Sequence, residues 1–79
     1  MKQVTKSQIR KVLGRAIRKH REQLDLTQEE LAERAEVHRT YLADIERGSR
    51  NPSVESVRRI AYALGVSISE LFKTAEQDS

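Results

Sequence analysis

The 79-residue sequence contains no cysteine, no tryptophan, one proline, one phenylalanine, two tyrosines and three glycines. The absence of cysteine excludes a small secreted domain that is held together by disulfide bonds. No run of about 18 apolar residues is present, which excludes a membrane-spanning helix, and no apolar stretch of a signal peptide follows the basic N-terminus. We therefore expect a cytoplasmic protein of one domain, whose core is aliphatic because aromatic residues are so few.

Charge, in contrast, is abundant and unevenly distributed along the chain. Residues 1–24 carry eight Lys or Arg and one acidic residue, whereas residues 25–37 carry five acidic residues and one Arg. Residues 38–59 are basic by +2 and residues 60–79 are acidic by −2, so the net charge is only +3. A basic surface therefore has to be assembled by folding. Charge alone does not distinguish a nucleic-acid partner from a solvated helix face.

Apolar residues recur at spacings of three and four, which predicts helices, and runs typical of strands are absent. A first helix is expected to begin at a Ser7 cap and to carry an apolar stripe that extends to Leu24. Gly14 lies inside this helix, where a glycine costs about 1 kcal/mol relative to alanine. His20 lies on or beside the stripe and is expected to pack at the edge of the core.

Two short helices are expected next. The sequence TQEE at residues 27–30 has the spacing of a capping box and predicts a helix that ends near Glu36. A further helix is expected over residues 39–47, with Gly48 as its C-terminal stop. A gap of about three residues separates the two helices, which is typical of a helix-turn-helix.

Two more helices fill the rest of the chain. The first follows a Ser53 cap, turns its apolar residues inward from Val54 onward and ends at Gly65, and the second opens with the capping-box sequence SISE at residues 67–70. Residues 74–79 show no apolar anchor and are expected to fray. The expected fold class is all-α: one compact five-helix domain over residues 1–79, with its core at about residues 7–73.

The predicted third helix carries side chains that can reach base edges in a DNA major groove. Arg39 can bond both acceptors of a guanine, and Thr40 can contact thymine, a base edge or a phosphate. Asp44 can accept a hydrogen bond from cytosine or orient Arg39. Tyr41 either reaches the DNA backbone or packs beside the helix. A solvated helix with a few charges is the alternative explanation of the same residues.

Three segments together resemble the phage-repressor type of helix-turn-helix domain, the XRE or Cro-C1 family. They are QEELA at residues 28–32, HRTYLADIERGSRNPS at residues 38–53 and IAYALGVSISELF at residues 60–72, and the resemblance covers roughly residues 10–73. Within this family, HRTY followed by IERG and RN is most similar to the controller proteins of restriction–modification systems. The resemblance implies a lambda-repressor-like five-helix bundle and a homodimer that binds a near-palindromic operator in double-stranded DNA, activating from one site and repressing once a second site fills.

The resemblance also implies roles for individual residues. Its base-reading positions correspond here to His38, Arg39, Thr40 and Asp44. Contacts to the DNA backbone are expected from Gln28, Tyr41, Arg47, Arg50 and Asn51. A buried salt bridge between the first and third helices is expected from Arg21 and Glu46. Apolar residues at the acidic C-terminal end suggest a dimer interface formed by Val66, Ile68, Leu71 and Phe72.

Two other classes of function compete with this interpretation. An antitoxin or co-regulator would use the same helix-turn-helix but would act mainly by binding a protein partner. An enzyme is disfavoured, because the sequence has no nucleophile elbow, phosphate-binding loop or zinc-binding HExxH motif. His20 and His38 lack a second ligand at metal-binding spacing. No cofactor, metal, small-molecule ligand or membrane is therefore expected among the partners.

Overall fold

The computed structural model of the chain describes residues 5–78, which form α-helices and connecting turns with no β-strand among them. The helices are α1 (Lys6–Gln23), α2 (Gln28–Ala35), α3 (Arg39–Arg47), α4 (Val54–Leu64) and α5 (Ile68–Gln77). This arrangement confirms the predicted all-α class and the order of its five helices. No helix in the described part of the chain is long and apolar enough to cross a membrane.

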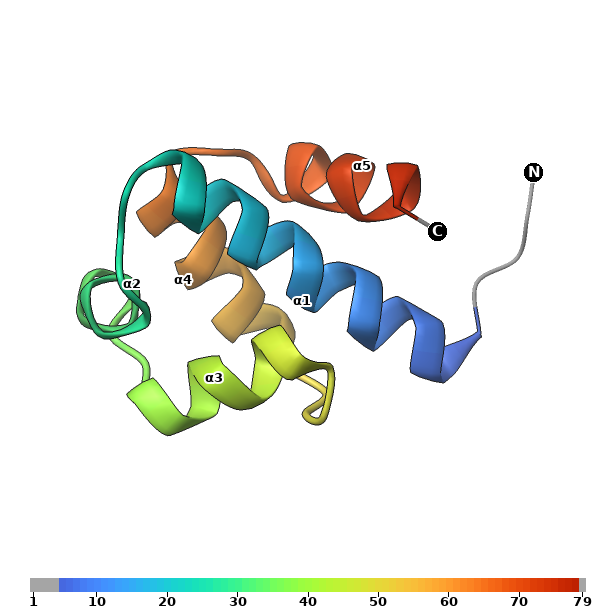
Figure 1. Cartoon of the computed structure of the whole chain (residues 1–79), viewed down its shortest axis with the longest axis horizontal. Coiled ribbons are helices and arrows are strands. Elements are labelled where there is room, and N and C mark those ends of the chain that lie inside the picture. Colours follow the sequence, from blue (N-terminus) through green and yellow to red (C-terminus); the bar gives the residue numbers. More distant parts are fainter. Residues whose placement is uncertain (1–4, 79) are drawn as a thin grey trace.

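The long helix α1 is the centre of the bundle. It packs against α3 on one side and α5 on the other, while α2 packs against α3 and α4 (Figure 1). The buried apolar residues between these helices are all aliphatic, as the scarcity of aromatic residues predicts. The largest fully buried side chains come from every helix: Ile17, Leu31, Leu42, Ile45, Ile60 and Leu71. One core therefore holds all five helices in fixed relative positions.

The local signals at the helix-turn-helix are confirmed in detail. The backbone N–H of Glu30 donates to Oγ1 of Thr27 over 3.1 Å, and the Thr27 N–H donates to Oε1 of Glu30 over 2.9 Å, which completes the capping box of α2. Three residues separate α2 from α3. Helix α3 ends at Gly48, whose φ of 77° lies in the left-handed region that favours glycine.

Three expectations about helix faces and ends are wrong. The N-cap of α1 is Thr5, because its hydroxyl and the side chain of Gln8 form a reciprocal capping box, so Ser7 lies inside the first turn. Leu24 follows the end of α1 and is 49% exposed. Val54 is the first residue of α4, where it points away from the core and is 81% exposed.

The expectation that residues 74–79 fray is also wrong for most of this segment. Helix α5 continues to Gln77, and Ala75 is fully buried in the core. The Thr74 hydroxyl donates to the carbonyl oxygen of Glu70 and lies 3.0 Å from Nε2 of His20 on α1. The anchor went unrecognised because alanine is a weak apolar signal by itself, yet its small side chain lets α5 pack closely on α1. Ser79 lies outside the described residues.

Candidate nucleic-acid interface

The first turn of α3 presents free polar side chains to solvent. His38, Arg39 and Thr40 are all exposed, and His38 is the N-cap of α3 but makes no capping hydrogen bond with its side chain. The opposite face of α3 carries Leu42 and Ile45 into the core. Because the core fixes α3 from behind, its outer face stays open at the edge of the bundle (Figure 1).

Asp44 organises two arginines rather than Arg39. Its carboxylate pairs with the guanidinium of Arg47 and lies 3.7 Å from Nη2 of Arg50. The side chains of both arginines remain more than half exposed, at 64% and 52%. The prediction that Asp44 could orient Arg39 is not what the structure shows. Asp44 instead holds two cations at the C-terminal end of α3 and in the loop that follows it.

Tyr41 packs beside the helix, which decides between the two alternatives that the sequence left open. Its hydroxyl accepts a hydrogen bond from the Ser53 N–H over 3.3 Å, and the Arg50 guanidinium lies 5.0 Å from its ring centroid. A hydrogen bond with the Ser56 side chain lowers the pKa of Tyr41 below its ordinary value of 10. Tyr41 therefore ties α3 to the loop of residues 49–53 and to the start of α4.

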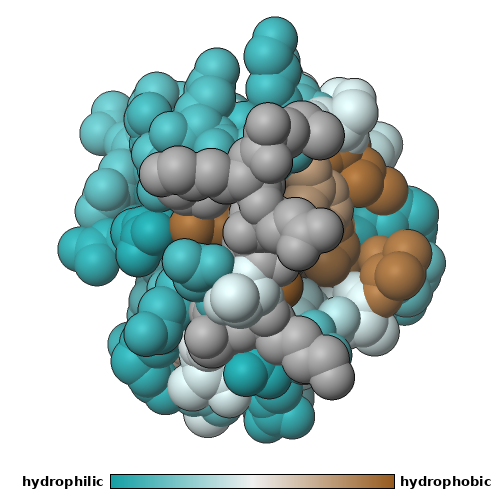
Figure 2. Space-filling model, turned by 90° about the vertical axis from the view of Figure 1, so that its right-hand side faces the viewer, coloured by the Kyte–Doolittle hydropathy of each residue, from teal (hydrophilic) through white to brown (hydrophobic). Residues whose placement is uncertain are grey.

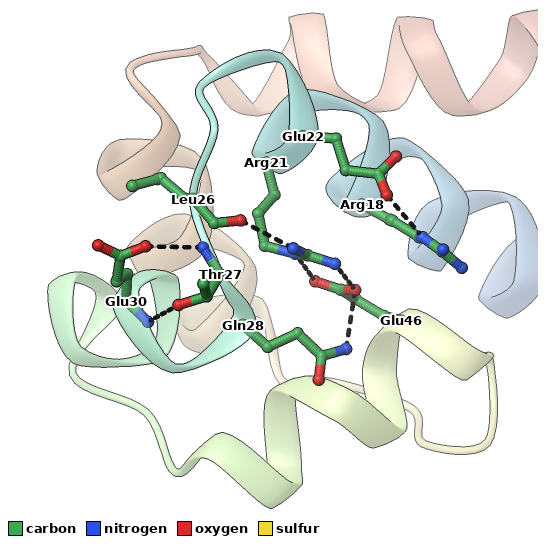
Figure 3. Close-up of polar contacts among 8 residues, drawn as sticks. All are labelled: Arg18, Arg21, Glu22, Leu26, Thr27, Gln28, Glu30 and Glu46. Carbon is green, nitrogen blue, oxygen red and sulfur yellow. Dashed lines mark hydrogen bonds and ion pairs between the residues drawn. The ribbon is translucent and has the colours of Figure 1, made fainter.

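A buried network connects α1, α2 and α3 behind this face (Figure 3). Arg21 donates from Nε to Oε2 of Glu46 over 2.8 Å and from Nη2 to Oε1 over 3.0 Å. Its Nη1 donates to the Leu26 carbonyl oxygen over 2.8 Å. Only 12% of the Arg21 side chain and 3% of the Glu46 side chain are exposed, and the hydrogen bond with Glu46 raises the pKa of Arg21. The structure therefore contains the ion pair that the resemblance implies, and Glu46 serves the fold.

Gln28 differs from the expectation that its side chain is free to hold a phosphate. The Gln28 Nε2 donates to Oε1 of Glu46 over 3.0 Å, so this side chain belongs to the buried network (Figure 3). Its position as the first residue of α2 still leaves backbone N–H groups at a helix N-terminus, where anions are favoured. Arg50 and Asn51, the loop residues, are exposed.

The four apolar residues expected at a dimer interface do not form one surface. Leu71 is fully buried in the core and has no surface to offer a partner. Val66 is half-buried in a hollow beside His20, Leu64 and Thr74. Ile68 and Phe72 line a different groove, together with the exposed Val54. Sequence reasoning missed Val54 because it assigned every apolar residue of the fourth helix to the core.

Residues 5–78 contain no group of three or more His, Cys, Asp or Glu side chains that could hold a metal ion. The acidic side chains nearest the face of α3 are used in capping or ion pairs, as Glu30, Asp44 and Glu46 show. The chemistry available on this face is therefore hydrogen bonding and positive charge, presented by a rigid helix.

Comparison with known proteins adds to this geometry. A helix-turn-helix family model matches residues 17–71. Control protein C.BamHI of Bacillus amyloliquefaciens is 42% identical over 64 residues, which cover 80% of this chain and 79% of that protein. The clp gene regulator ClgR of Corynebacterium glutamicum superposes with a TM-score of 0.86 at 34% identity, over 89% of this chain and 74% of that one. The restriction-modification controller protein C.Esp1396I, solved as a tetramer on its 35 base-pair operator, superposes with a TM-score of 0.82 at 33% identity, over 89% and 92% of the two chains.

Proposed function

The chain belongs to the helix-turn-helix family, and from this premise we propose that it is a sequence-specific DNA-binding regulator of transcription. It acts as a homodimer on a near-palindromic operator, in the manner of the controller proteins that it resembles. The observation that carries the proposal is the first turn of α3, where exposed and unpaired Arg39 and Thr40 are held by a helix whose other face is buried. The protein needs no cofactor for this role and has no catalytic one, and it works in the cytoplasm with the DNA that it regulates.

The proposal gives each side chain of the face a physical task. Arg39 reads a guanine through two parallel hydrogen bonds, and His38 and Thr40 contact the neighbouring bases. Asp44 holds Arg47 and Arg50 in place for the phosphates on either side. The N-terminus of α2 and the amide of Asn51 add further backbone contacts. Two such faces, about 34 Å apart in a dimer, would read the two halves of a near-palindrome.

In this scheme the buried network has an indirect role. Arg21, Gln28 and Glu46 fix the angle between α2 and α3, and that angle decides whether α3 can enter the groove while the start of α2 meets a phosphate. Tyr41 acts in the same way on the loop, because it holds Arg50 and Ser53. Regulation would follow from protein concentration and from the arrangement of sites: activation when one dimer is bound, and repression when a second site fills.

Replacing Arg39 with alanine tests the assignment of the recognition face. Loss of a bidentate base contact is expected to weaken operator binding by about 1–3 kcal/mol, or roughly 5- to 150-fold, while binding to unrelated DNA changes much less. The operator is first obtained by in vitro selection from random duplexes, and affinity is then measured by fluorescence anisotropy at a fixed salt concentration. An operator affinity equal to that of the wild type would contradict the assignment.

The matched control for this variant is Lys73→Ala. Lys73 is an exposed cation on α5, which lies on the opposite side of α1 from α3 (Figure 1). Its removal lowers the net charge by the same amount but touches no part of the proposed face. Equal losses in the two variants would show that Arg39 contributes only general electrostatic attraction.

A further inference from the structure

An apolar groove lies on the side of the molecule where the N-terminal half of α1 meets the loop of residues 49–53 and the first turns of α4 and α5. Its volume is about 170 Å³, and its walls include Ile9, Leu13, Pro52, Val54, Ile68 and Phe72. The hydrophobic residues visible from this side gather in one area, and hydrophilic residues cover most of the remainder (Figure 2). A cavity of roughly 150 Å³ is enough to hold a benzene molecule, so the groove has room for one large apolar side chain.

The rim of the groove carries the kind of side chain that would fill it. Val54 is 81% exposed and Ile68 is 39% exposed, and each is the first residue of its helix. Neither side chain is needed for the core in these positions. A projecting apolar side chain beside an apolar hollow makes the patch self-complementary, which is what a two-fold interface between identical chains requires. The occupant that fits the patch is therefore a second copy of the same patch.

A polar atom at the edge of the groove also lacks a partner. Nε of Arg10 is buried and has no hydrogen-bond acceptor among residues 5–78, although the side chain lines the groove. Leaving a buried donor unsatisfied is costly, and such groups are rare in folded proteins. A second copy seated in the groove would bring its own backbone and side-chain oxygens to this edge.

The groove shares a wall with the proposed DNA-binding face. Asn51 and Pro52 line the groove, and the adjacent Arg50 stacks on Tyr41 and pairs with Asp44. The next residue, Ser53, donates its N–H to the Tyr41 hydroxyl. One short loop is therefore fixed on one side by the groove and on the other by the residues that would contact phosphate.

We propose that a second copy of the chain seats in this groove through Val54 and Ile68, and that the loop of residues 49–53 couples its seating to DNA binding. The inference rests on the proposed function and adds a location and a regulatory consequence to the dimer. Contact with the partner holds Asn51 and Pro52, and through them it holds Arg50 in the position that DNA requires. Dimer formation thus improves each half of the binding face as well as joining two of them.

The double variant Val54→Asp/Ile68→Asp tests where the second copy seats. A carboxylate at the first residue of a helix is favourable, so both substitutions should leave the helices intact while they charge the patch. Sedimentation velocity is expected to show that the dissociation constant of the dimer rises by about 30-fold or more. The control is Tyr62→Asp, because Tyr62 is also 81% exposed and lies on α4 but does not line the groove. Its dimer should be unchanged.

A measurement on the wild type covers the case in which the double variant fails to fold. On dilution of ¹⁵N-labelled protein, the amide signals of residues around the groove should shift as the dimer dissociates, whereas those around Tyr62 should not. A double variant that is folded and still dimeric would overturn the proposal. Concentration-dependent shifts confined to another part of the surface, or their complete absence, would overturn it equally.

The coupling is tested on a duplex that contains one half-site only. Neither a dimer nor a monomer can engage two sites on this DNA, so a difference in affinity reports the state of a single binding face. The double variant is expected to bind the half-site about 5-fold more weakly than the wild-type dimer, a typical lower value for coupling between sites. Equal affinities would overturn the coupling. Failure of the wild type to bind any selected operator would instead contradict the proposed function.

Discussion

Replacing Gly14 with alanine is expected to destabilise the protein by about 2 kcal/mol or more, although alanine is the better helix former. A Cβ atom at this position would lie 2.4 Å from the carbonyl oxygen of Ile45 and 2.6 Å from that of Glu46. Both are backbone atoms of α3, so no side chain can rotate to make room. Helices α1 and α3 would have to move apart, and the packing around the buried network would be lost with them.

Thermal and urea unfolding followed by circular dichroism measures this effect. For a domain of this size, a loss of 2 kcal/mol lowers Tm by roughly 10 °C. The control is Lys19→Ala on α1, because Lys19 is exposed and its substitution should change the free energy of unfolding by no more than about 0.5 kcal/mol. A Gly14→Ala variant as stable as the wild type would mean that α1 and α3 do not cross as closely as described.

Gly14 also illustrates which features the sequence can predict. Its cost to the first helix is visible from local propensity, but its purpose depends on a contact with residues that lie about 30 positions further along the chain. The capping box at Thr27, the stop at Gly48 and the exposed turn at Arg39 depend only on neighbouring residues, and the structure confirms all three as local features. Local chemistry therefore predicted the helix-turn-helix well.

The apolar residues of the last two helices could not be sorted in the same way. Leu71 and Ile68 lie three positions apart and share a helical repeat, yet one is fully buried and the other is 39% exposed. The distinction depends on how α5 lies on α1, which no local pattern encodes. For the same reason the sequence did not reveal that Gln28 donates to Glu46, or that Asp44 pairs with two arginines instead of Arg39.

Replacing Glu46 with alanine is expected to have the largest effect of any substitution considered, a loss of about 3–5 kcal/mol in the free energy of unfolding. The Arg21 guanidinium would keep its hydrogen bond to the Leu26 carbonyl but would lose two hydrogen bonds and its counter-charge in a site where it is only 12% exposed. The Gln28 amide would lose its acceptor at the same time. The control is Glu22→Ala, which removes an ion pair with Arg18 whose side chains are 63% and 56% exposed and should cost at most about 1 kcal/mol.

The double variant Arg21→Met/Glu46→Leu separates stability from the position of the helices. Replacing a buried ion pair by apolar side chains is often close to neutral, so the double variant should be more stable than Glu46→Ala, and the two positions should show strong non-additivity. Without the fork that joins α1 and α3, however, the Gln28 amide still has no acceptor, and the angle between α2 and α3 is held by packing alone. Operator binding should therefore remain weaker than in the wild type even where folding is restored. A double variant that recovers both stability and operator affinity would show that the ion pair serves the fold but does not align α2 and α3 for DNA.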